Sequence, residues 1–181
     1  MNIDFSQPEI IVGAIVLMAI LYKTLVKHKD EEGRIMDSSV KISNVIESVE
    51  EFAPKLNPKL KDGYTEKSIQ NQLKRHLQDK YVNVVDEYGI EGTNATKIDF
   101  DIGNGKVGLE LKLAKALFKT SNLHRLVGQI EDYVDKKYDE DNLIVAVYGE
   151  KHHSRERTML ETIQTKIEEK GGEYIYLELP R

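Results

Sequence analysis

Residues 97–113, KIDFDIGNGKVGLELKL, restrict the folding of this chain more than any other stretch. Apolar and polar residues alternate on both sides of an Asn-Gly pair, a pattern typical of a β-hairpin with a two-residue turn. With Asn104 and Gly105 as the turn, Phe100 lies opposite Leu109. A slip of one residue would move every apolar side chain to the other face, so the register is well specified. One apolar face is predicted, made by Ile98, Phe100, Ile102, Val107, Leu109 and Leu111.

The polar face of the same hairpin places two acids side by side. In this register Asp99 lies opposite Glu110, and directly opposed residues have Cβ atoms about 4.5–5.5 Å apart. Two carboxylates at that distance favour a bound cation or a proton on one of them. Lys112 follows Glu110 by two residues, so it lies on the same face. The alternative is an exposed sheet face with ordinary solvated charges.

This set of side chains predicts a site for metal-assisted hydrolysis of a phosphodiester. Carboxylate oxygens suit Mg²⁺ or Mn²⁺, and Mg²⁺ often binds through one or two carboxylates plus substrate phosphates. The ion would polarise the phosphate and lower the pKa of a bound water. Lys112 would position that water or stabilise the developing charge.

The order of the expected elements predicts the fold class. Helices are expected over 38–53, 65–78, 119–137 and 155–170, and strands over 82–88, 96–102, 106–113, 143–149 and 173–179. This order is typical of a three-layer α/β domain with a mixed central sheet. Three parts are expected: an N-terminal membrane anchor (1–27), a linker with an accessory helix (28–63), and an α/β domain (64–181).

Asp99 and the Glu110-Leu111-Lys112 triplet resemble the D…ExK core of the PD-(D/E)xK nuclease superfamily, which has the restriction-endonuclease-like fold. The element order over about 65–149 is similar to the αβββαβ core of that superfamily, so the resemblance covers roughly half of the chain. Ile98 stands where the motif name has proline, a common departure that removes no ligand. The resemblance implies hydrolysis of DNA with Asp99 and Glu110 as metal ligands and Lys112 as the catalytic lysine.

Glu66 is a further candidate, on the first helix of the expected core. It precedes Ile69 by three residues and Leu73 by seven, so it lies on the apolar stripe. A glutamate there is costly unless it has a partner. The resemblance implies that an acid at this position completes the metal site. Alternatively, Glu66 is a first-turn glutamate that interacts favourably with the helix dipole.

Gln129 and Tyr133 lie four residues apart and therefore share a helix face. They resemble the QxxxY motif of the exonuclease-like branch of the superfamily, which implies that they help to hold DNA near the site. The alternative is a half-buried tyrosine beside a surface glutamine.

Charge is distributed unevenly along the chain. The net charge is −5, which gives no general attraction to nucleic acid. Residues 106–125 nevertheless contain five basic side chains and one acid, so a local surface is expected to contact a phosphate backbone. The basic residues are Lys106, Lys112, Lys115, Lys119 and Arg125. The alternative is a solvated charged face. The chain has no cysteine, which excludes disulfides and thiolate chemistry.

The N-terminal region contains an uncharged run, IIVGAIVLMAILY (10–22), which extends to Val26 if Lys23 reaches out of the bilayer. This length is at the short limit for a transmembrane helix. Acids precede the run and lysines follow it, so the C-terminal domain is expected in the cytoplasm of a single-pass protein. The alternative is a buried core helix or an oligomerisation stripe.

Together these patterns predict a membrane-anchored, metal-dependent nuclease that hydrolyses DNA, with foreign or damaged DNA as possible targets. The alternative is a catalytically silent interaction or nucleic-acid-binding module of the same fold within a membrane-associated assembly. A homo-oligomer or a partner membrane protein is compatible with either. The choice between DNA and RNA, and between endonuclease and exonuclease action, stays open.

Overall fold

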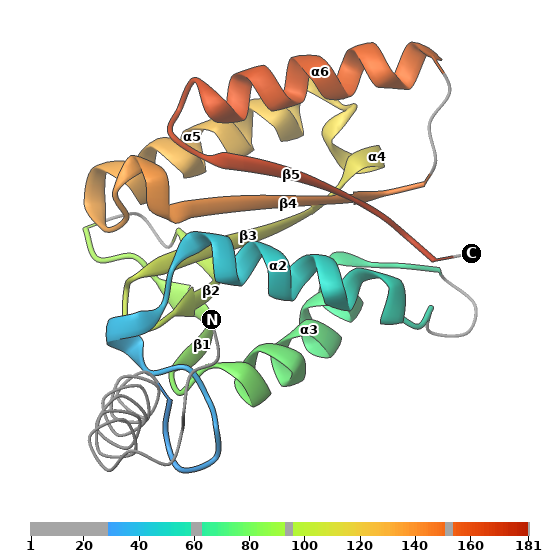
Figure 1. The fold of residues 1–181 in the computed structure, drawn as a ribbon. Coiled ribbons are helices and arrows are strands. Elements are labelled where there is room, and N and C mark those ends of the chain that lie inside the picture. Colours follow the sequence, from blue (N-terminus) through green and yellow to red (C-terminus); the bar gives the residue numbers. More distant parts are fainter. Residues whose placement is uncertain (1–28, 59–62, 93–95, 151–153, 181) are drawn as a thin grey trace, which may run out of the picture.

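The computed structural model describes residues 29–58, 63–92, 96–150 and 154–180. Its centre is a five-stranded mixed sheet in the order β1-β2-β3-β4-β5, so the predicted α/β class is confirmed (Figure 1). The first three strands are antiparallel and the last three are parallel. The strands are β1 (Val84–Gly89), β2 (Lys97–Ile102), β3 (Val107–Leu113), β4 (Leu143–Gly149) and β5 (Glu173–Glu178).

Helices cover both faces of this sheet (Figure 1). The described helices are α2 (Ile42–Phe52), α3 (Glu66–Lys80), α4 (Ala114–Leu117), α5 (Thr120–Lys136) and α6 (Ser154–Glu168), with short 3₁₀ turns at Asp37–Ser39, Ala53–Lys55 and Glu140–Asn142. Helices α2 and α3 pack on one face, and α4, α5 and α6 pack on the other. The sequence anticipates the long helices to within a few residues at their ends, but it does not anticipate α4.

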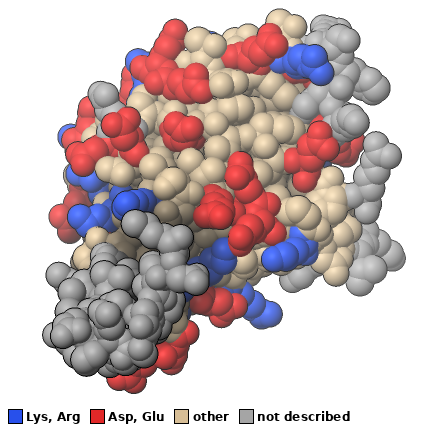
Figure 2. Space-filling view, in the orientation of Figure 1, with Lys and Arg blue, Asp and Glu red and all other residues tan. Residues whose placement is uncertain are grey.

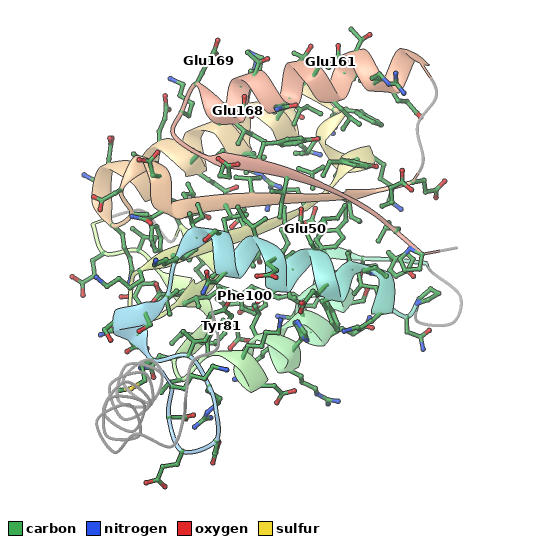
Figure 3. The ribbon with its side chains drawn as sticks, in the orientation of Figure 1. Glu50, Tyr81, Phe100, Glu161, Glu168 and Glu169 are labelled. Atoms are coloured by element: carbon green, nitrogen blue, oxygen red, sulfur yellow. The ribbon has the colours of Figure 1, made fainter. Side chains whose placement is uncertain are left out.

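Two apolar clusters fill the spaces between these layers. Val49 of α2 and Leu73 of α3 pack with Leu109 on one side of the sheet. Ile130 and Ile163 belong to the cluster on the other side. Strand β4 is buried along its whole length because it lies at the centre of the parallel part of the sheet, which explains its continuous apolar run. Figure 3 shows Tyr81 and Phe100 inside the first cluster, whereas Glu50, Glu161, Glu168 and Glu169 point outward.

The start of α3 is set by a capping box. The Thr65 hydroxyl accepts a hydrogen bond from the Ser68 N–H at 3.1 Å, and the Thr65 N–H donates to the Ser68 hydroxyl at 3.0 Å. This arrangement satisfies N–H groups at the first turn, which have no partner within the helix. Glu66 is therefore held as the first residue of the helix.

The predicted register of the β2–β3 hairpin is confirmed. Phe100 pairs with Leu109 and Ile102 pairs with Val107, as expected from the alternation. Strand β2 ends at Ile102 and strand β3 begins at Val107. The turn therefore spans residues 103–106 and is two residues longer than predicted. Three successive turn residues have positive φ angles, namely Gly103 (69°), Asn104 (55°) and Gly105 (87°). Glycine and asparagine tolerate this backbone conformation, which explains the composition of the turn.

Strand β2 departs from regular pairing at Asp99. Its pairing with β3 stops at Phe100. Its pairing with β1 continues, but Asp99 and Glu87 do not pair, and Glu87 has a positive φ of 50°. Ile98, just beyond this point, packs in the α5 and α6 cluster, whereas Leu111 packs in the α2 and α3 cluster. The prediction that Ile98 shares an apolar face with Leu111 is therefore wrong, because the strand does not continue its regular alternation past Asp99.

The predicted anchor, residues 10–26, lies outside the described residues. Among the residues that the structure describes, no helix has both the length and the apolar character needed to cross a membrane.

Candidate active site

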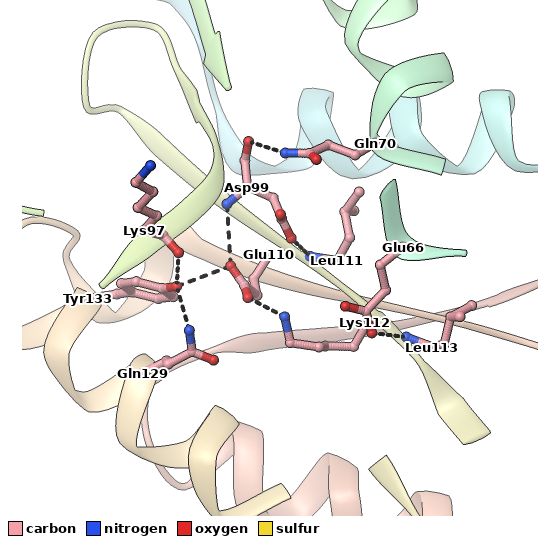
Figure 4. Close-up of polar contacts among 10 residues, drawn as sticks. All are labelled: Glu66, Gln70, Lys97, Asp99, Glu110, Leu111, Lys112, Leu113, Gln129 and Tyr133. Carbon is pink, nitrogen blue, oxygen red and sulfur yellow. Dashed lines mark hydrogen bonds and ion pairs between the residues drawn. The ribbon is translucent and has the colours of Figure 1, made fainter. Parts of the chain in front are cut away.

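Asp99 and Glu110 meet where β2 and β3 stop pairing through their backbones (Figure 4). The Leu111 N–H donates to Asp99 Oδ2 at 2.7 Å, and the Asp99 N–H lies 3.3 Å from Glu110 Oε2, which accepts from it. Each carboxylate therefore accepts a hydrogen bond from a backbone N–H of the facing strand. In a regular ladder that N–H would donate to a backbone carbonyl oxygen. The sequence predicted that the two acids lie side by side, and the structure brings them together through these bonds.

The Lys112 ammonium lies against Glu110 Oε1 in a buried ion pair. Only 3 % of the Glu110 side chain and 12 % of the Lys112 side chain are exposed. Burial disfavours the charged form of Lys112, but the carboxylates of Glu110 and Asp99 outweigh it, so the net effect raises the pKa of Lys112. The lysine is thus held as a cation within the site.

Burial, together with the negative charge of Glu110, raises the pKa of Asp99 to about 7. Lys112 and the Leu111 N–H act in the opposite direction but do not cancel these effects. A buried carboxyl next to a second carboxylate is a place where an additional cation is favourable. Strongly shifted groups of this kind occur preferentially at functional sites.

Glu66 reaches the same site from α3. Its Oε1 accepts a hydrogen bond from the Leu113 N–H at 3.1 Å, across 47 residues of sequence. The charge of Glu66 also contributes to the raised pKa values of Asp99 and Lys112, so these side chains interact electrostatically. Glu66 therefore lies in the first turn of α3 and also beside the site, so the two alternative predictions for this residue are compatible.

Gln70 also lies next to the site, although it was not among the residues predicted from the sequence. It is buried, one turn after Glu66 on α3, and its Nε2 donates to the Asp99 carbonyl oxygen at 3.4 Å. Its Oε1 accepts from Lys67 Nζ at 3.0 Å. Its spacing of four residues from Glu66 places both side chains on one helix face, which is the signal that could have identified it.

Tyr133 lies beneath the site, on α5. Its side chain is fully buried, and its hydroxyl lies 2.6 Å from the Lys97 carbonyl oxygen and 3.2 Å from Glu110 Oε2. Gln129 Nε2 lies 3.5 Å from the same hydroxyl. Burial and the Glu110 charge raise the pKa of Tyr133, so it stays protonated. The geometry places Tyr133 against Glu110 rather than on an exposed surface.

Of the five predicted basic residues, three lie on the exposed surface after β3, whereas Lys106 lies in the turn before β3 and Lys112 is largely buried within it. Lys115, Lys119 and Arg125 are exposed, and none of them forms an ion pair with the residues that the structure describes. By contrast, Lys67 and Lys74 of α3 pair with Glu87 and Asp86 of β1, which neutralise them.

The surface formed by α2 and α6 is predominantly acidic. Figure 2 shows that acidic side chains outnumber basic ones over α2 and α6 in that view. Exposed acids there include Glu47, Glu50, Glu51, Glu161, Glu168 and Glu169. A surface of this charge disfavours a polyanion, so contact with a phosphate backbone is favoured on the side of α4 and the start of α5.

The donor chemistry of the site fits a hard divalent cation. Asp99 and Glu66 each use one carboxylate oxygen on a backbone N–H, and their second oxygens make no hydrogen bond with the described residues. Within the described ranges, no three His, Cys, Asp or Glu side chains converge closely enough to enclose an ion as they stand. Two carboxylates are sufficient for Mg²⁺, which keeps several waters in its coordination shell.

No family model, curated protein or solved structure matches this chain. The fold defines the molecule as an α/β domain with a five-stranded mixed sheet. The site defines it further as a domain with a cluster of buried and half-buried carboxylates and one lysine where β2 and β3 stop pairing.

Proposed function

We propose that this protein is a metal-dependent nuclease of the restriction-endonuclease-like fold that hydrolyses DNA phosphodiester bonds. The observation that carries the proposal is the joint placement of Asp99, Glu110 and Lys112 where β2 and β3 separate. The mixed sheet with helices on both faces is compatible with this fold.

Asp99 and Glu110 would hold Mg²⁺ or Mn²⁺, with Glu66 as a third ligand. When bound, the cation supplies charge that polarises a phosphoryl oxygen and acidifies a water molecule. Glu110 is buried, and Asp99, Glu66 and Lys112 are half-buried, so electrostatic interactions among them are stronger than those between fully exposed groups.

Lys112 has the donor that phosphodiester hydrolysis requires. Its ammonium is fixed by Glu110 and stays charged, so it can donate a hydrogen bond to the attacking water or to a phosphoryl oxygen as negative charge develops. Tyr133 acts on Glu110 through its hydroxyl and thereby helps to position that carboxylate. Lys115, Lys119 and Arg125 provide free positive charge for the backbone of the DNA.

The decisive experiment incubates the full-length protein with linear, circular and single-stranded DNA, and with RNA, in Mg²⁺, Mn²⁺ or a chelator. We expect metal-dependent cleavage that is lost in Glu110→Gln. Glu131→Gln is the matched control, because Glu131 is an exposed glutamate whose carboxylate pairs with Lys170 rather than with the proposed metal ligands or Lys112. Cleavage that persists in the chelator or in Glu110→Gln would overturn the assignment. Nucleic-acid binding without any cleavage would favour the silent interaction module.

We also propose that residues 10–26 anchor the protein in a membrane with residues 64–181 in the cytoplasm. The support is the uncharged run, the acids before it and the lysines after it. Membrane fractionation tests this proposal, with extraction by detergent but not by high salt as the expected result. Release of the full-length protein by high salt alone would contradict it.

A further inference from the structure

A pocket of about 420 Å³ lies beside the candidate active site, at the carboxyl ends of the parallel strands β3 and β4. Ligands of α/β sheets commonly bind outside the carboxyl ends of parallel strands. The volume falls within the range of small-molecule sites, about 300–1,000 Å³. Of the residues proposed to bind the metal ion or the DNA backbone, Lys115 alone lines this pocket.

Tyr148 lines the pocket, and its buried hydroxyl lacks a hydrogen-bond partner among the residues that the structure describes. The residue is 0 % exposed, and its Oη makes no hydrogen bond with any residue that the structure describes. A buried hydroxyl without a partner costs free energy, so native structures contain few of them. A ligand that carries an acceptor would remove this cost when it enters the pocket.

The remaining lining combines aromatic rings, two acids and one lysine, Lys115. Tyr64 and Phe118 add two further rings, and Glu150 and Glu156 add carboxylates. Aromatic rings stack with the planar faces of nucleobases. The carboxylates can accept hydrogen bonds from base amino groups, whereas they repel phosphate. The rings and carboxylates favour the base of a nucleotide, whereas Lys115 can contact a neighbouring phosphate.

The pocket adjoins the candidate active site at Leu113. Leu113 lines the pocket, and its N–H donates to Glu66, whereas Lys112 directly precedes it on β3. Tyr64 precedes Glu66 by two residues and lies on the pocket wall. A phosphate near Lys112 would therefore place an adjacent base at the pocket entrance.

We propose that this pocket binds an unpaired nucleobase next to the phosphodiester that is cleaved. The inference rests on the proposed nuclease function and narrows its substrate to single-stranded DNA, or to duplex ends and distortions from which one base can unstack. A fully paired duplex cannot fill the pocket because its bases are stacked within the helix.

Binding of abasic oligonucleotides tests this proposal. Full-length protein is titrated in a chelator, which prevents metal-dependent cleavage, with a labelled single strand and with a fully abasic strand of the same length and charge. We expect the strand with bases to bind at least about fivefold more tightly, because stacking is lost in the abasic strand. Equal affinities would overturn the proposal.

Two variants locate the effect. Tyr148→Phe removes the hydroxyl alone and Phe118→Leu removes one ring, and each should reduce the preference for the strand with bases. Tyr174→Phe is the matched control, because the Tyr174 hydroxyl is also buried without a partner among the described residues but does not line the pocket. A preference that is unchanged in both pocket variants, or equally reduced in the control, would place the base elsewhere and overturn the proposal.

Binding of a free nucleoside monophosphate is measured as well. Its binding without any difference between the two strands would identify a mononucleotide site and overturn the proposal. Since none of these titrations requires cleavage, the base preference and the nuclease activity fail independently. Cleavage without a base preference removes the pocket assignment only, whereas a base preference without cleavage removes the enzymatic assignment.

Discussion

The Asp99 N–H donates to the Glu110 carboxylate, and this bond, with a second from the Leu111 N–H to Asp99, takes the place of regular β2–β3 pairing. Asp99 Oδ2 accepts the Leu111 N–H at 2.7 Å, and Glu110 Oε2 accepts the Asp99 N–H at 3.3 Å. The two carboxylates are thereby held in the opening between strands instead of standing out from a regular sheet. Their mutual repulsion is partly balanced by Lys112, and an additional cation between them would reduce it further.

Lys112→Met should lower metal-dependent cleavage by at least about 100-fold, because it removes a charged donor to the reacting groups. It should also destabilise the fold by about 3–5 kcal/mol, because Glu110 is left buried without its partner. Adding Glu110→Gln should recover part of this stability but none of the cleavage. Chemical unfolding and initial cleavage rates measure both effects.

Lys74→Met is the control for this experiment. It breaks the pair with Asp86, whose members are about one-third exposed, so a loss of about 0–1 kcal/mol and normal cleavage are expected. A Lys112 variant that cleaves as well as this control would refute the role of the lysine.

Tyr133→Phe should lower kcat with little change in KM, because the hydroxyl contacts Glu110 and does not lie on an exposed substrate surface. Tyr138→Phe is the matched control, since its hydroxyl donates to buried Asp101 at 2.8 Å. Each variant should lose about 1–3 kcal/mol of stability by leaving a buried acceptor unsatisfied. Steady-state kinetics decide the matter: an equal fall in kcat in both variants would indicate a structural role only.

The raised pKa of Asp99 predicts how stability depends on pH in a chelator. The pKa of Asp99 is about 7 in the folded protein, whereas its ordinary value is 3.8, so between these values the folded state binds more protons than the unfolded state. Stability contributed at this site therefore falls as pH rises through that range. The Tm of the wild type minus the Tm of Asp99→Asn should therefore be smaller at about pH 8 than at about pH 5.

Mg²⁺ provides the complementary measurement. At the higher pH it should raise the Tm of the wild type by binding only the folded state, and it should raise that of Asp99→Asn much less. A difference in Tm between wild type and variant that does not change with pH would show that Asp99 is not the coupled group.

Replacing Lys115, Lys119 and Arg125 by glutamine should weaken DNA binding and make it less sensitive to salt. The slope of log affinity against log salt concentration should fall by about one for each phosphate that the protein no longer neutralises. The reason is that these exposed cations have no acidic partner among the described residues. Lys67→Gln serves as the control because Lys67 is paired with Glu87. Titrations at several salt concentrations measure the slope, and an unchanged slope in the triple variant would exclude this surface.

Gly108→Ala should destabilise the protein by about 1–3 kcal/mol through overpacking. A Cβ at this position would lie 2.6 Å from Ile98 Cδ1 and 2.8 Å from Tyr138 Cε2. Gly128→Ala on α5 meets nothing within 4 Å and should stabilise the helix by about 0.5–1 kcal/mol. Urea unfolding of the two variants should show changes of opposite sign, and a neutral Gly108→Ala would disprove the close packing at this hairpin.

The hairpin illustrates how far the sequence alone determines this protein. The pairing of Phe100 with Leu109 follows from local alternation and the Asn-Gly turn, because a slip would expose the apolar face. The start of α3 follows from the capping residues Thr65 and Ser68, and the buried strand β4 follows from its apolar run. These features depend on residues that are neighbours in the chain.

The tertiary structure alone decided how the candidate site is assembled. Its contacts join segments that are up to 47 residues apart. They are the bond from the Leu111 N–H to Asp99, the bond from the Leu113 N–H to Glu66 and the contact of Tyr133 with Glu110. Such contacts arise from the packing of α3 and α5 on opposite faces of one sheet, which no local periodicity encodes.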